Sequence, residues 1–144
     1  MKYFILLLAA VLLAQAEGEW KVKTVDEFND MRRDCHKEIP FSEELQKKEE
    51  VLRFPDEEVV RKYLLCIAKT WEVFDEENGF NMDRLIVEFE LLLNRDEVLP
   101  IAKRCVDKNE QGSSPDVWVY RVQQCVGKTK LGPLFLEALG KLSK

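Results

Sequence analysis

The placement of four cysteines behind an N-terminal export signal constrains this chain more than any other feature of its 144 residues. The chain opens with Lys2, an apolar run beginning at Tyr3 and an A-x-A cleavage pattern ending at Ala16. The run of about 11 apolar residues is too short to cross a bilayer, which needs about 20. We therefore expect a secretory signal peptide over residues 1–16 and a secreted, extracellular mature chain over residues 17–144.

The cysteines themselves are Cys35, Cys66, Cys105 and Cys125. An even number of cysteines in an exported chain indicates a disulfide framework, because the extracellular compartment is oxidising. Four cysteines allow three pairings, and their spacing alone does not choose among them. Residues 17–144 are enough for one domain with a real hydrophobic core, so disulfides would support the fold rather than replace the core.

Composition excludes several classes of function. The chain is 46% apolar and 34% charged, which is typical of a soluble globular protein. Its net charge is −5, and loss of the leader removes one more lysine, so nucleic-acid binding is not expected. Beyond the leader, no apolar stretch is long enough to span a membrane.

The spacing of apolar residues predicts an all-α fold of about six short helices. Thr24 and Glu27 form a capping box at the start of the first helix, and Ser42 and Asn81 are expected caps of two others. Asp116 is the expected cap of the sixth helix, which should continue to Val126. The other expected landmarks are a longer third helix from Asp56 that is broken at Asn78-Gly79, and Pro100 in the first turn of the fifth helix.

The C-terminal residues form a separate apolar segment that could begin at Gly132-Pro133, since proline is favoured at the first helical position. Two interpretations remain open for this segment, which includes Leu131, Phe135 and Leu142. It is a terminal helix docked on the core, or it is a lid over a ligand cavity.

Catalytic chemistry finds little support. His36 is the only histidine, and the cysteines are better explained as disulfides than as nucleophiles. We expect His36 to be a partly exposed helix residue beside a disulfide. The acidic clusters lack the spacing of a calcium loop, and no second histidine or Cys-x-x-Cys pair is present. We therefore expect no catalytic residues, no metal site and no cofactor.

Several segments resemble one family. Tyr63-Leu64-Leu65-Cys66, Phe74 to Phe80, Cys105 to Glu110 and Asp116 to Cys125 look like the insect odorant-binding proteins (pheromone and general odorant-binding), particularly their fly members. That family usually has six cysteines, with three residues between the second and third and eight between the fifth and sixth. Here these two positions fall at Lys62 and Asp116, so the chain resembles the C-minus branch, which lacks both.

The resemblance implies the pairing Cys35–Cys66 and Cys105–Cys125, each bridge adding about 3–4 kcal/mol of stability. It also implies that Lys62 and Asp116, which stand where a third bridge would be, are close in space. We hypothesise that they form an ion pair between the third and sixth helices. The alternative is that both are ordinary solvated residues.

As for function, the resemblance implies a secreted carrier of a small hydrophobic ligand, such as an odorant, pheromone or lipid-like molecule, held in an internal apolar cavity. Tyr63 or Tyr120 could donate a hydrogen bond to a ligand oxygen. A chemosensory receptor is a possible partner, and the chain would be a monomer or weak dimer that takes part in the sense of smell. Helical phase together with the resemblance predicts these lining residues: Leu64, Ile67, Trp71, Phe74, Phe80, Leu85, Phe89, Trp118, Val122 and Phe135.

Two alternatives come from other classes of protein. A signalling or storage protein of haemolymph or secretory fluid would act through its surface, with a filled core and an exposed apolar patch. A secreted enzyme would need a polar cleft around His36.

Overall fold

Helices make up nearly all the regular structure of this chain. The computed structural model describes residues 18–50 and 52–140, so the predicted signal peptide, Val51 and Leu142 lie outside the described residues. The elements in order are α2 (Val25–Glu38), α3 (Glu43–Glu49), α4 (Glu58–Thr70), β1 (Phe74–Asp75), β2 (Gly79–Phe80), α5 (Met82–Phe89), α6 (Arg95–Cys105), α7 (Pro115–Gly127) and α8 (Leu131–Ala138). The all-α prediction is confirmed.

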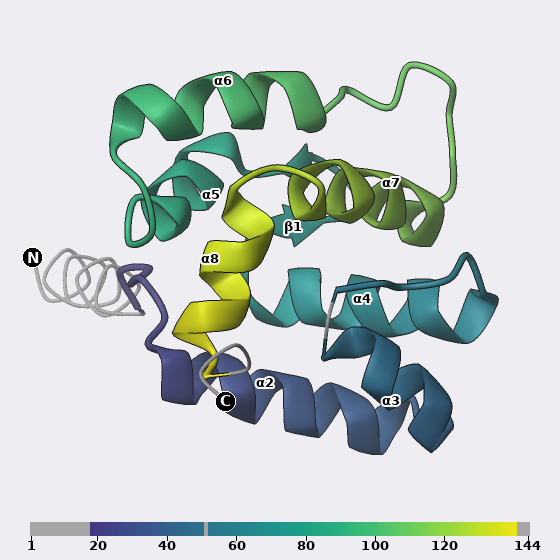
Figure 1. Cartoon of the computed structure of the whole chain (residues 1–144). Helices are drawn as coiled ribbons and strands as arrows, with labels where there is room; N and C mark the ends of the chain where they lie inside the picture. The colour runs from purple at the N-terminus through teal and green to yellow at the C-terminus, as the bar shows by residue number, and fades with distance from the viewer. Residues whose placement is uncertain (1–17, 51, 141–144) are drawn as a thin grey trace, which may run out of the picture.

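The helices enclose a shared core. In Figure 1, α2, α3 and α4 lie below and α5, α6 and α7 above, while α8 runs downward from the end of α7 toward α2. The most extensive packing joins α4 to α7, and α2–α4 and α5–α6 follow equally. Val60 and Tyr63 of α4, Val98 and Ala102 of α6, and Leu131 at the start of α8 are each at most 1% exposed. Segments distant in the sequence therefore converge on one core, with α4 at its centre.

Three of the predicted helix starts are confirmed. Thr24 and Glu27 form the reciprocal capping box, with Thr24 N–H donating to the Glu27 carboxylate at 2.7 Å and Glu27 N–H to the Thr24 hydroxyl at 3.2 Å. Ser42 caps α3, and Asn81 caps α5. These side chains satisfy backbone donors that have no partner within the helix, which is why local sequence predicts them well.

The expected third helix is shorter than predicted. It ends at Thr70, and a two-residue hairpin follows in which Phe74 pairs with Phe80 and Asp75 with Gly79. The Asp75 carboxylate accepts the N–H groups of Glu77 and Asn78 at 2.9 and 2.7 Å, which closes the turn. Strands of two residues are too short to leave an alternating pattern in the sequence.

Two other helix starts also differ from expectation. Because α6 begins at Arg95, with Asn94 as its cap, Pro100 lies in the second turn and not the first. Ser114 occupies the N-cap position of α7 without a side-chain hydrogen bond, and Pro115 is the first helical residue, so Asp116 lies inside the first turn instead of capping it. Proline at the first helical position is favoured because its missing N–H would have no partner there.

Both implied disulfides are present. Cys35 of α2 is bonded to Cys66 of α4, and Cys105 at the end of α6 is bonded to Cys125 of α7. The bridges fix α2 against α4 and α6 against α7. No described cysteine is free.

The predicted ion pair between Lys62 and Asp116 is wrong, because each of these residues has a different partner. Lys62 Nζ lies 2.5 Å from Glu58 on its own helix. Asp116 instead pairs with Arg61, whose Nε lies 3.0 Å from its carboxylate. Neighbouring helical residues point about 100° apart, so a difference of one residue decides which side chain faces α7. The charged link between α4 and α7 therefore exists, but through Arg61.

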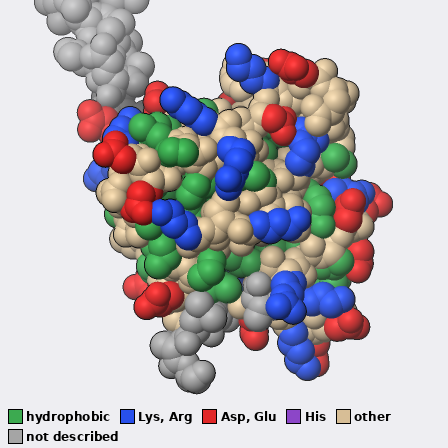
Figure 2. Space-filling view, turned by 45° about the horizontal axis from the view of Figure 1, so that its top comes forward, with side chains coloured by type: hydrophobic (Ala, Val, Ile, Leu, Met, Phe, Trp, Pro, Cys, Tyr) green, Lys and Arg blue, Asp and Glu red, His purple; other side chains and the backbone are tan. Residues whose placement is uncertain are grey.

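The surface mixes charges of both signs. On the face shown in Figure 2, acidic and basic side chains both occur, with hydrophobic side chains between them. Within residues 18–50 and 52–140, no helix is both long and apolar enough to cross a membrane.

Candidate functional site

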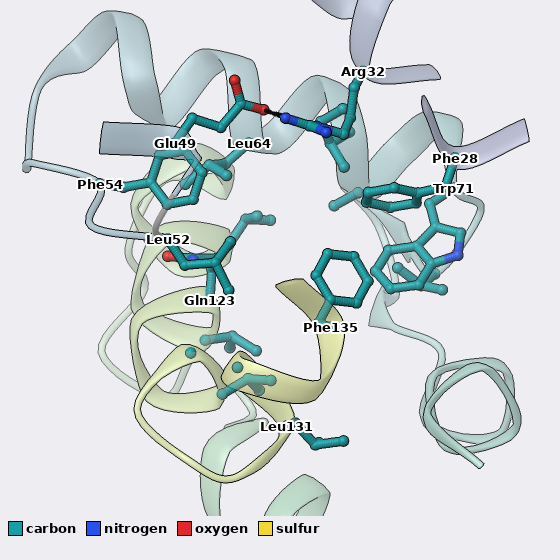
Figure 3. Close-up of a pocket in the computed structure, with 18 of the residues that line it drawn as sticks. Phe28, Arg32, Glu49, Leu52, Phe54, Leu64, Trp71, Gln123, Leu131 and Phe135 are labelled. Carbon is teal, nitrogen blue, oxygen red and sulfur yellow. Dashed lines mark hydrogen bonds and ion pairs between the residues drawn. The ribbon is translucent and has the colours of Figure 1, made fainter. Parts of the chain in front are cut away.

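A mostly apolar pocket of about 140 Å³ opens between the helices. We call it the central pocket. Its walls come from α2, the end of α3, α4, β2, α5, α7, α8 and the segment between α3 and α4, whereas α6 contributes no lining residue. Figure 3 shows how side chains from these elements point toward one another around it. An amphipathic helix must bury its apolar face, and here several such faces meet without filling the space between them.

Most of the residues predicted from helical phase lie on the walls of this pocket. Residues of α4 and its C-terminal end form one side, and Phe135 projects from α8 on another (Figure 3). Whether they contact a ligand stays a prediction. The predicted residues that line the pocket are Leu64, Ile67, Trp71, Phe80, Leu85, Phe89, Val122 and Phe135.

Phe74 and Trp118, which were also predicted, do not line the central pocket. Their rings pack edge-on at 5.4 Å, and Phe80 contacts both. Trp118 also lies directly over Gly79, where an added Cβ would come within 2.2 Å of the indole ring. The hairpin folds back after α4 and carries Phe74 toward α7, so this aromatic cluster fastens the hairpin to that helix.

The structure adds lining residues that the sequence did not single out. Phe28 of α2 belongs to the apolar stripe of its helix, so its sequence spacing predicts a buried side chain. That spacing does not show whether the side chain lines a pocket or packs in the core. Leu52 and Phe54 come from the non-helical segment before α4, where Leu52 adopts a positive φ of 53°. Residues in such a segment have no periodicity from which their direction could be predicted.

One end of the pocket is polar. Glu49, the last residue of α3, is only 5% exposed and lines the pocket together with Arg32. Arg32 donates through Nε at 2.9 Å and Nη2 at 2.7 Å to one Glu49 oxygen, which also accepts the Tyr63 hydroxyl at 2.5 Å. His36 Nε2 lies 2.7 Å from the other oxygen. A single carboxylate thus joins α3 to α2 and α4, and Figure 3 shows its contact with Arg32.

The charge states in this cluster follow from competing effects. Burial alone would raise the pKa of Glu49, but the hydrogen bond from Tyr63 and the charge of Arg32 outweigh it and hold that pKa below its usual value. Burial and the adjacent carboxylate both raise the pKa of Tyr63. Glu49 is therefore ionised and Tyr63 is neutral over the physiological range.

His36 belongs to this cluster. Its ring stacks on Tyr63 at 4.4 Å, lies 4.4 Å from the Phe41 ring, and its side chain is 24% exposed. Among the described residues, no group of three or more His, Cys, Asp or Glu side chains could hold a metal ion.

The two tyrosines proposed as ligand donors already have acceptors. The Tyr63 hydroxyl donates to Glu49, and the Tyr120 hydroxyl donates to the Phe54 carbonyl at 3.0 Å. The lining amide of Gln123 differs from them. Its oxygen accepts from Gln124 at 2.9 Å, whereas its Nε2 makes no hydrogen bond within the described part of the chain.

Helix α8 closes one side of the pocket. Leu131 and Leu136 are buried, and the ring of Phe135 packs edge-on against Phe28 at 5.0 Å. Gly132 allows the close approach to α7, because a Cβ there would lie 2.2 Å from the Gly127 carbonyl oxygen. Helix α8 is thus docked on the core and also forms a wall of the central pocket, so whether it acts as a lid stays a prediction.

A second hollow of about 170 Å³ lies beside the central pocket. The two share Phe28, Trp71, Phe89, Phe135 and Leu139, which form the wall between them. We call it the adjoining hollow.

One wall of the adjoining hollow contains Glu88, which is 5% exposed and accepts the Lys23 N–H at 3.0 Å. Burial raises the pKa of Glu88, and this hydrogen bond only partly opposes the shift. Glu88 thus resembles Glu49 in burial, but no cation within residues 18–50 and 52–140 contacts its carboxylate directly.

Comparison with known proteins agrees with this architecture. The model of the PBP/GOBP family matches residues 17–129. General odorant-binding protein 99a of Drosophila melanogaster is 30% identical over 138 residues, which cover 93% of this chain and 94% of the relative. Odorant-binding protein 22 of Aedes aegypti is 27% identical over 131 residues, covering 91% and 93%. Together with the two disulfides and the all-helical fold, these matches show that the chain belongs to the PBP/GOBP family of insect odorant-binding proteins.

Proposed function

We propose that this protein is a secreted, extracellular carrier that holds one small, mostly apolar molecule in the central pocket. The observation that supports this proposal is the pocket itself, since apolar side chains from five helices surround it and few polar groups interrupt them. Membership of the PBP/GOBP family supports the same role, because the relatives of this chain are named as odorant-binding proteins.

Binding would be driven by removal of apolar surface from water. Each Å² of apolar surface buried contributes about 25 cal/mol, so a ligand that contacts several walls at once gains affinity without any charged contact. The size of the pocket limits that ligand. An apolar cavity of about 150 Å³ in another protein holds benzene. The central pocket, at about 140 Å³, therefore suits a single ring or a short chain unless a wall moves.

The alternative of a surface-acting signalling or storage protein expects a filled core. The open pocket favours the carrier. The carrier role needs no catalytic step, and delivery to a chemosensory receptor stays a prediction from the sequence.

Native mass spectrometry of the purified secreted protein tests this function. The protein is incubated with a panel of short alcohols, ketones, esters and aromatic volatiles. We expect saturable binding with one ligand per chain, and quenching of Trp71 fluorescence in a parallel titration, since Trp71 lines the pocket. Absence of binding across the panel would overturn the carrier role.

A further inference from the structure

The polar end of the central pocket contains an ion pair that is complete without a ligand. Glu49 is 5% exposed and has partners on both oxygens, from Arg32, Tyr63 and His36. A buried carboxylate is costly unless it is paired and hydrogen-bonded, and here both conditions are met within the protein. The guanidinium of Arg32 likewise has its counter-ion already in place.

The other charges around the pocket do not offer an anion a second partner. Arg32 is the only cationic residue that lines the described pocket, whereas two carboxylates, Glu49 and the exposed Glu50, also line it. A ligand carboxylate at this end would have to displace Glu49 from Arg32, which would leave Glu49 buried without its cation. Breaking a buried pair in this way is strongly unfavourable.

We propose that Glu49 is a built-in counter-ion that occupies the position an acidic ligand would need, so that the pocket selects neutral ligands over their carboxylate analogues. This inference rests on the proposed carrier function and names the ligand class for the same pocket. Alcohols, ketones, aldehydes and esters belong to that class, and short fatty-acid anions do not.

Gln123 supplies the polar contact that a neutral ligand needs. Its amide projects from α7 on the side of the pocket near Leu52 (Figure 3). Because its oxygen is engaged by Gln124 while its Nε2 has no acceptor among the described residues, the amide can donate to a ligand oxygen. The two tyrosines cannot do this without losing their present acceptors.

A matched pair of ligands, hexanol and hexanoate, tests the inference at pH 7. The two have the same chain length and differ in the charge of the head group. Isothermal titration calorimetry on the wild-type protein should give an affinity for hexanol at least about tenfold higher than for hexanoate, which is the scale of a lost charge-assisted hydrogen bond. Equal affinities, or tighter binding of hexanoate, would overturn the proposal while leaving the carrier role intact. Failure of both ligands and of the wider panel would instead overturn the carrier role.

Substitution of Glu49 provides the complementary measurement. Glu49→Gln keeps the size of the side chain but frees the charge of Arg32, so hexanoate should gain affinity and the order of the two ligands should reverse. Glu43→Gln is the matched control, because it removes an exposed carboxylate from the same helix, α3, that does not line the pocket, and it should leave the order unchanged. Reversal in both variants would mean that net charge alone sets the preference, which contradicts the inference. If Glu49→Gln does not fold, as judged by circular dichroism, equal or tighter binding of hexanoate by the wild-type protein would still overturn the proposal.

Discussion

The ring of Phe135 on α8 packs edge-on against Phe28 on α2, with ring centroids 5.0 Å apart. Phe28 makes the same kind of contact with Trp71 at the end of α4, also at 5.0 Å. These three aromatic rings lie between the central pocket and the adjoining hollow. Edge-to-face pairs of this kind add about 0.5–1.5 kcal/mol to the free energy gained by burial. Phe135 thus does two things: it fastens α8 to the core, and it limits the length of the central pocket.

Replacement of Phe135 by alanine should enlarge the site at a cost in stability. We expect Phe135→Ala to lower the free energy of unfolding by about 1–3 kcal/mol, below the value for a fully buried ring because this one is half-buried. The variant should bind the bulky fluorescent probe N-phenylnaphthylamine more tightly, since the two hollows would join. Leu91→Ala is the control, because Leu91 borders the adjoining hollow but is 65% exposed. Unchanged probe affinity in Phe135→Ala would show that the ring does not limit the site.

The sequence predicts an element well when the residues that determine it are neighbours in the chain, and poorly when they are not. The Thr24–Glu27 capping box involves only four neighbouring residues, so the residue types alone predicted it correctly. The position at which α4 ends depends on residues that are distant in the sequence. The hairpin after Thr70 is held by Trp118, which lies on another helix, and no pattern near Thr70 reveals that contact.

The contact between Trp118 and Gly79 can be tested directly. Gly79 has a positive φ of 75° and no space for a Cβ, whereas Gly112 has a similar φ of 67° and no atom within 4 Å of a Cβ position. We expect Gly112→Ala to cost about 1 kcal/mol of stability through backbone strain alone. Gly79→Ala should cost clearly more, because Trp118 must also shift. Chemical denaturation of both variants measures the difference, and equal costs would mean that Trp118 moves freely.

The link between Arg61 and Asp116 gives a prediction that separates neighbouring residues. In a double-mutant cycle, Arg61→Ala and Asp116→Ala should show favourable coupling, because the two side chains are 3.0 Å apart and partly buried. The cycle with Lys62→Ala and Asp116→Ala should show none, since Lys62 contacts Glu58. Thermal denaturation of the wild-type protein, the three single variants and the two double variants measures both coupling free energies. Coupling of Lys62 but not Arg61 would contradict the observed helix phase.

The candidate site was predicted only in part for a related reason. Helical phase placed Leu64, Ile67 and Trp71 on one face of α4, and that face does border the pocket. Phase could not identify Glu49 or Arg32, because a charged residue is expected in solvent unless its partner is known. The partners of Glu49 lie 17, 13 and 14 residues away along the sequence, on two other helices. Only their packing shows that the carboxylate is buried.

Glu49 and Glu88 should give opposite contributions to stability as the pH falls. The pKa of Glu49 is lowered in the folded state, so its carboxylate stabilises the fold at neutral pH. That contribution should decline as the pH falls below about 4.5, the ordinary value for glutamate, and vanish below the folded pKa. The pKa of Glu88 is raised, so ionisation of Glu88 destabilises the fold at neutral pH. That penalty should disappear as the pH falls through the folded pKa of Glu88.

Unfolding free energies of three proteins between pH 3 and pH 7 measure these contributions. Glu49→Gln should be less stable than the wild-type protein at pH 7, and the gap should narrow in acid, because protonation removes the same charge from the wild-type protein. Glu88→Gln should equal or exceed the wild-type stability at pH 7, since it keeps a hydrogen-bond acceptor for the Lys23 N–H without the buried charge. If the Glu49→Gln gap stayed constant over this range, the carboxylate of Glu49 would not titrate differently in the folded and unfolded chains. Its ion pair with Arg32 would then contribute through packing alone.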